Sequence, residues 1–212
     1  MEEVKKVGRP SGTARAKKSI KAEHYQILID YIDESDMKDR LKLRYKRAFC
    51  LLHFLGVRVG ELLLLQVKDI RLSITGEASL TNETKTKRPR HLMFTANAVA
   101  AIEELFEEYL VEDPSRKIPH DPEHIIFHSP NKPKIPLNKS TFTKSINDII
   151  HDALGPLYSS HSNRQAILED FAKNGTNPRI AQKFIGHSSV NTTNNYFHPD
   201  EGDVRAALDQ IR

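Results

Sequence analysis

The spacing of apolar residues predicts that most of this chain is helical. Apolar side chains such as Leu28, Ile29 and Ile32 recur three and four residues apart, which places them on one face of a helix. The same spacing recurs in three later segments, the last of which we expect to begin at a Ser140 cap. The helices are predicted over residues 22–32, 37–55, 97–111 and 141–154.

Residues 69–95 depart from the helical spacing. Ile70, Leu72 and Ile74 alternate with polar residues, Gly76 supplies a turn, and a second extended piece, HLMFT, follows a basic turn at 83–90. We predict a small antiparallel sheet of two or three strands, with an edge strand near the proline of the basic turn. The predicted fold class is therefore mainly α with one small antiparallel β-sheet.

Composition narrows the class of protein. The chain has 212 residues, 38% of them hydrophobic, which is enough for one domain with a core. The single cysteine, Cys50, lies in an apolar run, so we expect no disulfide framework and a reducing compartment. The chain lacks both a signal peptide and a run of about 18 apolar residues, so we expect a cytoplasmic protein that neither spans a membrane nor is secreted.

Positive charge is concentrated at the N-terminus. Residues 1–21 hold seven Lys or Arg against two Glu, whereas the whole chain has a net charge of +4. We expect a flexible basic tail over 1–19 that is attracted to polyanions, a folded domain over 20–199, and a C-terminal helix over 200–212. We expect this tail to have no sequence preference; the alternative is a minor-groove reader, because Gly8-Arg9-Pro10 resembles the core of an AT-hook.

The side chains with the clearest potential for catalysis lie between residues 158 and 198. His161 and Arg164 are three apart, so the imidazole and the guanidinium can point at one ligand from one helix face. Gly186-His187-Ser188-Ser189 predicts the end of one helix and a serine cap on the next, with Tyr196 about two turns into that second helix. A phenol, a guanidinium and imidazoles are groups that attack on a phosphodiester requires.

This pattern resembles the C-terminal signature of the tyrosine recombinase (phage integrase) family. The signature is His-x-x-Arg, then a Gly-His pair, then a tyrosine about nine residues later, and GHSSVNTTNNYFH matches its second part. Asn163 and Gln165 depart from it, since leucine and histidine are common at these positions. The likeness covers about residues 20–200, as in the small single-domain inversion recombinases of fimbrial type.

The resemblance implies roles for further residues. In GVRVGEL, Arg58 resembles the family's first phosphate-binding arginine, with Glu61 orienting it by an ion pair. Counting back from HLMF places Lys85 on the family's catalytic lysine, with Lys87 as the alternative. The implied catalytic set is Tyr196, Arg58, Arg164, His161, His187 and Lys85, and the expected DNA-binding residues are Lys87, Arg88, Arg90, Arg9, Lys17 and Lys18.

The implied function is site-specific recombination of double-stranded DNA through a 3′-phosphotyrosine bond, without cofactor or metal. The resemblance also implies a homotetramer on paired DNA sites, linked by the C-terminal helix docking on a neighbouring subunit. Packing of that helix on its own domain is the alternative. Alternatives are relaxation of DNA like that of a type IB topoisomerase, a non-catalytic DNA-binding relative, and a helical protein without a role on DNA. We further expect His53, which lies alone in an apolar stretch, to be a core histidine.

Overall fold

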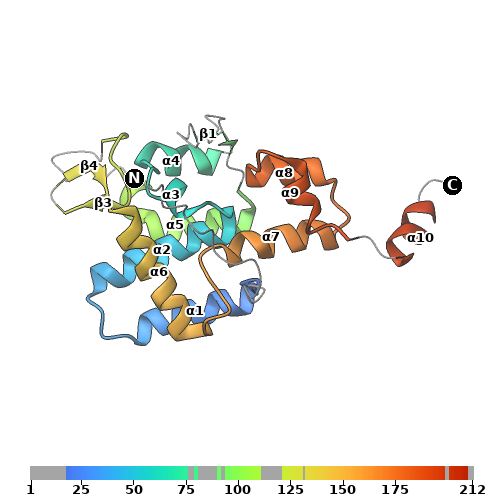
Figure 1. Cartoon of the computed structure of the whole chain (residues 1–212). Coiled ribbons are helices and arrows are strands. Elements are labelled where there is room, and N and C mark those ends of the chain that lie inside the picture. The colour runs from blue at the N-terminus through green and yellow to red at the C-terminus, as the bar shows by residue number, and fades with distance from the viewer. Residues whose placement is uncertain are drawn as a thin grey trace, which may run out of the picture.

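The computed structural model describes residues 18–75, 79–80, 90–91, 94–110, 121–130, 132–198 and 201–209 (Figure 1). The helices are α1 (Ala22–Glu34), α2 (Asp39–Leu55), α3 (Val59–Leu62), α4 (Val67–Thr75), α5 (Ala96–Leu110), α6 (Lys139–Leu154), α7 (Ser162–Lys173), α8 (Pro178–Ile185), α9 (Val190–Asn194) and α10 (Glu201–Asp209). The strands are β1 (Ser79–Leu80), β2 (Arg90–His91), β3 (His128–Ser129) and β4 (Lys132–Pro136). None of the helices so described is long and apolar enough to cross a bilayer.

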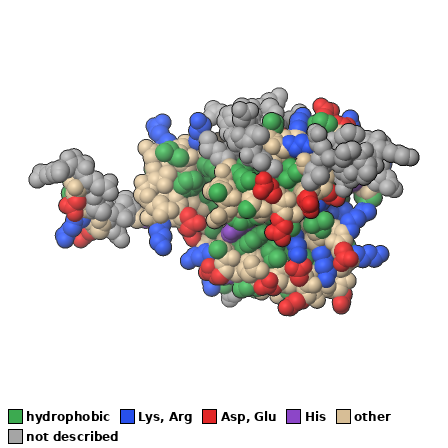
Figure 2. All heavy atoms as spheres, turned by 180° about the vertical axis from the view of Figure 1, so that it is seen from behind, with side chains coloured by type: hydrophobic (Ala, Val, Ile, Leu, Met, Phe, Trp, Pro, Cys, Tyr) green, Lys and Arg blue, Asp and Glu red, His purple; other side chains and the backbone are tan. Residues whose placement is uncertain are grey.

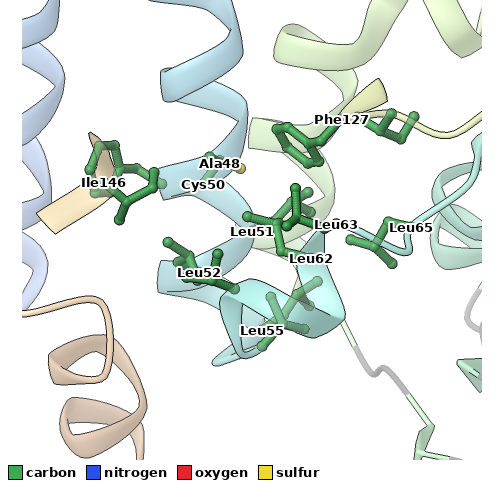
Figure 3. Packing of buried hydrophobic residues seen from close by; sticks show 14 of the residues in the cluster. Ala48, Cys50, Leu51, Leu52, Leu55, Leu62, Leu63, Leu65, Phe127 and Ile146 are labelled. Atoms are coloured by element: carbon green, nitrogen blue, oxygen red, sulfur yellow. The ribbon is translucent and has the colours of Figure 1, made fainter. Parts of the chain in front are cut away.

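Helix α2 runs through the centre of the larger core. Its second half is apolar on almost every side, so it is surrounded by α1, α5 and α7, while α6 packs against α1 (Figures 1 and 3). Leu51, Leu52 and Leu55 are fully buried there, together with Leu62 and Leu65 from the segment after α2. Figure 3 shows these leucines gathered around one centre, and this core holds the end of α2 in place.

A smaller core lies among the C-terminal helices. It consists of Leu168, Ala181 and Ile185, with Tyr196 and Phe197 partly buried against it. Helix α7 connects the two cores, because it contacts α2 on one side and α8 on the other. The C-terminal helices α7, α8 and α9 therefore form a unit at one end of the body (Figure 1).

Two antiparallel strand pairs accompany the helices. In the first, Ser79 pairs with His91 and Leu80 with Arg90, which agrees with the predicted sheet. In the second, β3 pairs with β4, which the sequence analysis does not anticipate. The fold class, mainly α with a small antiparallel sheet, is confirmed.

Two local predictions are wrong. Residues 67–75 form helix α4 and not the start of a strand. The helical spacing of Val67 and Ile70 coexists there with the alternation, both side chains are buried, and the Asp69 carboxylate accepts a hydrogen bond from the Gln66 N–H at 2.8 Å. Helix α6 is capped by Asn138, whose side chain accepts from the Thr141 N–H, and not by the serine two residues later.

Gly56 supplies a test of how closely α2 meets the C-terminal unit. Its φ of 54° is left-handed, and a Cβ at this position would lie 2.8 Å from Ile167 Cδ1 and 3.0 Å from Ile185 Cδ1. Gly56→Ala combines a backbone cost of about 1–2 kcal/mol with overpacking of about 1–3 kcal/mol, so we expect a clear fall in the free energy of unfolding.

The matched control is Gly175→Ala. Gly175 also has a left-handed φ, of 63°, but a Cβ there meets nothing within 4 Å. Urea unfolding should show that Gly56→Ala loses more stability than Gly175→Ala, and the difference should equal the overpacking cost. Equal losses for the two variants would contradict the close packing of α2 against α7 and α8.

Candidate catalytic site

Arg164 is buried between the two cores and joins them. Its Nη1 donates to the Gly56 carbonyl, and its Nη2 donates to the Ile185 carbonyl at 2.8 Å. Both carbonyls belong to helix ends, where the backbone oxygens have no partner within their own helix. Arg164 is only 5% exposed, and its position is set by α2, α7 and α8 together.

Glu61 lies between the two arginines of the predicted site. Its Oε1 is 2.7 Å from Arg58 Nη1, and its Oε2 accepts from the Arg58 N–H at 3.0 Å and lies 4.0 Å from Arg164 Nη1. The Glu61 carboxylate is buried, whereas the Arg58 side chain remains 39% exposed. Two guanidiniums share one carboxylate, so the group keeps an excess positive charge that attracts an anion.

His161 borders the two arginines. It is the residue before α7, three positions ahead of Arg164, as the sequence spacing predicts. Partial burial of the ring lowers the pKa of His161, and the positive charges of Arg164 and Arg58 lower it further. The imidazole is therefore held in its neutral form near neutral pH, and a neutral imidazole can accept a proton.

His187 follows the end of α8. Gly186 has a φ of 73° and ends the helix, as predicted, so His187 lies two residues after the carbonyl that binds Arg164. Its Nδ1 is 3.0 Å from Oγ1 of the fully buried Thr193, and its backbone carbonyl accepts from the Gln182 side chain at 3.1 Å. These contacts fix the ring against α9, and the threonine is a partner that the sequence analysis does not identify.

Tyr196 lies outside the helix in which it was predicted. Helix α9 begins at the Ser189 cap, as expected, but ends at Asn194, and Tyr196 lies in the following turn with its N–H donating to the Thr193 carbonyl at 3.0 Å. Consecutive asparagines favour turns over helix interiors, which is the physical reason for the short helix. Tyr196 is partly buried against the smaller core, so its ring is anchored on the unit that carries His187.

Most of the predicted basic residues lie outside the part of the chain that the structure describes. These are Lys85, Lys87, Arg88, Arg9 and Lys17. Arg90 is in β2, where its backbone pairs with that of Leu80. Lys18 is exposed at the start of the described chain.

Asn163 explains one departure from the signature. It is buried within α7 at 1% exposure, and its side chain faces His53 of α2. His53 also stacks on Tyr25 with ring centroids 4.5 Å apart, and burial lowers its pKa, in agreement with the predicted core histidine. A polar residue in the leucine position is therefore matched by a polar partner across the helix interface, which no local sequence pattern reveals.

Comparison with known proteins agrees with this arrangement. The model of the phage integrase family matches residues 18–202. The chain belongs to this family. It is 26% identical over 200 residues to the tyrosine recombinase XerD of Halalkalibacterium halodurans. The aligned residues make up 92% of this chain and 62% of XerD. The chain therefore spans about three fifths of the length of that relative.

Solved structures show the same fold at lower identity. The match to a crystal structure of XerA recombinase covers 97% of this chain and 67% of the XerA chain, with a TM-score of 0.59 and 21% sequence identity. The Tn1549 transposon integrase in complex with a circular intermediate DNA covers 95% of this chain and 68% of its own, with a TM-score of 0.68 and 17% identity.

The electrostatic coupling of His161 to the arginines is testable without a substrate. Arg58→Gln removes one of the two positive charges that lower the pKa of His161, so we expect that pKa to rise toward the ordinary value of about 6.5. Lys173→Gln removes an exposed cation from the far end of the same helix and should leave it unchanged. An NMR titration of the His161 ring measures both, and an unchanged pKa in Arg58→Gln would contradict the proximity.

Proposed function

We propose that this chain is the catalytic part of a site-specific recombinase that cleaves and rejoins double-stranded DNA through a 3′-phosphotyrosine intermediate. The observation that carries the proposal is the group formed by Arg58, Glu61, Arg164 and His161, in a member of the phage integrase family. Solved relatives include a transposon integrase in complex with DNA, which supports DNA as the substrate.

The arginines bind the phosphate in this proposal. Attack on a phosphodiester adds negative charge to the non-bridging oxygens, and planar guanidiniums are suited to hold them. Glu61 holds the two guanidiniums near each other before DNA arrives, so little reorganisation accompanies the reaction. His187 donates a further hydrogen bond to the phosphate while Thr193 holds its Nδ1 side.

In this proposal, His161 and a lysine of the basic turn transfer the protons. A phenol becomes a good nucleophile only as its proton leaves, so Tyr196 must lose its proton as it attacks phosphorus. The lowered pKa of His161 suits it to accept that proton. Lys85, or alternatively Lys87, protonates the departing 5′-oxygen. Reversal by a 5′-hydroxyl of another strand rejoins the DNA, so the chemistry requires neither a metal nor a cofactor.

Basic residues outside the catalytic group extend the contact with DNA in this proposal. These residues are Lys18, which is exposed, and Arg90 of β2, together with Arg9, Lys17, Lys87 and Arg88 from outside the described part of the chain. The setting is the DNA of the host cell, including nucleoid-associated DNA. Relaxation of the type IB topoisomerase kind uses the same attack, and no feature of the described residues favours it.

Tyr196→Phe tests the function. The phenol oxygen is the only group proposed to bond to phosphorus, so the variant should bind DNA with unchanged affinity and form no SDS-resistant adduct. The substrate is a nicked duplex selected from a random-sequence pool by its covalent attachment to the unaltered protein.

Tyr45→Phe is the control for loss of a tyrosine hydroxyl. Tyr45 is half-buried on α2 and stacks on Phe142 with ring centroids 6.0 Å apart. This variant should form the adduct at the unaltered rate. An undiminished adduct from Tyr196→Phe would refute the assignment of the nucleophile.

Assembly through α10 is the second part of the proposal. The helix stands apart from the body (Figures 1 and 2). Its apolar residues Val204 and Leu208 are 54% and 58% exposed. A short helix with an exposed apolar face gains stability by covering that face. We propose that the occupied surface is that of a neighbouring copy of this chain, so that a head-to-tail contact closes a tetramer on paired DNA sites.

A groove of about 830 Å³ between α2, α7 and α8 fits this occupant. Its floor is apolar, with Phe54, Ile167 and Phe184, and Ile180 at its edge is 58% exposed. Two of its lining residues, Arg179 and Lys183, are basic, whereas α10 carries acidic residues at both ends, Glu201 and Asp209. The groove's apolar lining and its excess of basic residues, Arg179 and Lys183 against Asp170, therefore agree with α10 as the occupant.

The double variant Val204→Ala with Leu208→Ala tests this assembly. Both side chains are exposed in one copy, so the melting temperature of the free protein should not change, while sedimentation on paired DNA sites should lose the tetramer. Ile180→Ala in the groove should give the same loss. Ile27→Ala, which removes an apolar side chain of similar exposure (45%) on α1, is the control and should assemble normally.

A fall of several degrees in the melting temperature of the double variant would show that α10 packs on its own subunit. Assembly that survives both the helix and the groove variants would refute the groove as the docking surface.

A further inference from the structure

The loop between α6 and α7 determines where His161 lies, and α6 holds it from one side. His161 is the last residue before α7, so the path of residues 155–160 sets the position of its ring. The side chain of Asn147 accepts from the Ser160 N–H at 2.9 Å, and His151 Nε2 is 3.1 Å from the Tyr158 carbonyl. Both contacts come from the last turns of α6.

A second set of contacts comes from the start of the described chain. Residues 18–24, which we call the strap, run along the same loop. The Lys18 N–H donates to the Leu157 carbonyl at 2.9 Å, and the Ile20 N–H donates to the Ser162 carbonyl at 3.1 Å. Ile20 is fully buried, which anchors the strap in the larger core. The strap therefore binds the chain on both sides of His161.

A side-chain hydrogen bond completes the strap. His24 Nε2 is 3.1 Å from the Tyr158 hydroxyl, and the two rings lie 5.1 Å apart. The Lys21 N–H donates to His24 Nδ1 at 3.2 Å, so in the neutral ring Nε2 carries the proton and donates to the tyrosine oxygen. One side chain of the strap thus holds the loop three residues before His161.

We infer that the strap, through Ile20 and the His24–Tyr158 hydrogen bond, is a positioning device for His161 in the reaction. This inference rests on the proposed function, in which His161 accepts the proton of Tyr196. A loop without such contacts samples many conformations, and a proton acceptor must lie within hydrogen-bond reach of its donor. Ile20, His24 and Tyr158 are positioning residues, since none of them is proposed to touch DNA.

The chain offers a matched pair of variants for the test. Tyr158→Phe removes a tyrosine hydroxyl that links α1 to the loop before His161. Tyr31→Phe removes a tyrosine hydroxyl that links α1 to α6 itself, at 3.4 Å from Asp152 Oδ2, without touching the loop. Both variants lose one hydrogen bond between α1 and the rest of the body. They differ in its partner, because the bond of Tyr158 holds the loop before His161 and the bond of Tyr31 does not.

The first readout is covalent attachment to the selected nicked duplex. We expect Tyr158→Phe to slow adduct formation at saturating DNA on the order of 10-fold, since a misplacement of about 1 Å can cost about 10²-fold. The DNA concentration for half-maximal rate should stay unchanged. Tyr31→Phe should match the unaltered protein in both quantities, and His24→Ala combined with Tyr158→Phe should be no slower than the slower single variant.

The second readout is the NMR signal of the His161 ring in the free protein. Its chemical shift and pKa should change in Tyr158→Phe and not in Tyr31→Phe, with both variants folded. Equal rates and equal His161 signals for the two variants would overturn the inference. If the unaltered protein forms no adduct, the proposed function fails, while the NMR comparison still decides whether the strap positions His161.

Discussion

The buried guanidinium of Arg164 holds the end of α2 and the end of α8 at one point. It donates to the Gly56 and Ile185 carbonyls and lies 4.0 Å from Glu61. A buried cation is costly unless charge and hydrogen bonds compensate it, and here a carboxylate and two helix-end carbonyls do so. Lysine has the charge but not the rigid fork that reaches two carbonyls at once, so the position requires arginine.

Several other features depend on this contact. Gly56 must lack a side chain, because α7 and α8 approach it closely where its carbonyl meets Arg164. Glu61 is buried only because two guanidiniums face it. The groove that we propose for α10 is lined by α7 and α8, the same helices that Arg164 ties to α2. An occupant of the groove would therefore contact α7, which carries Arg164, and α8, which His187 follows.

One departure from the family signature lies against side chains remote in sequence. Asn163, in a position where leucine is common, faces His53 of α2, and Tyr25 stacks on that histidine. The loop before His161 is likewise held by α6 and by the strap. In both cases a segment next to the candidate site packs against a helix that carries none of the proposed catalytic residues.

Local interactions explain what the sequence alone determined about this protein. Apolar spacing, the glycines that end α2 and α8, and the serine that caps α9 act within a few residues, so the helices and the order of the site residues could be predicted. Residues 67–75 satisfy helical and alternating spacing together, and only burial of Val67 and Ile70 in the core selects the helix. The meeting of Arg58 with Arg164 and the strap on His161 were decided by tertiary structure, because contacts between remote segments depend on how whole helices pack.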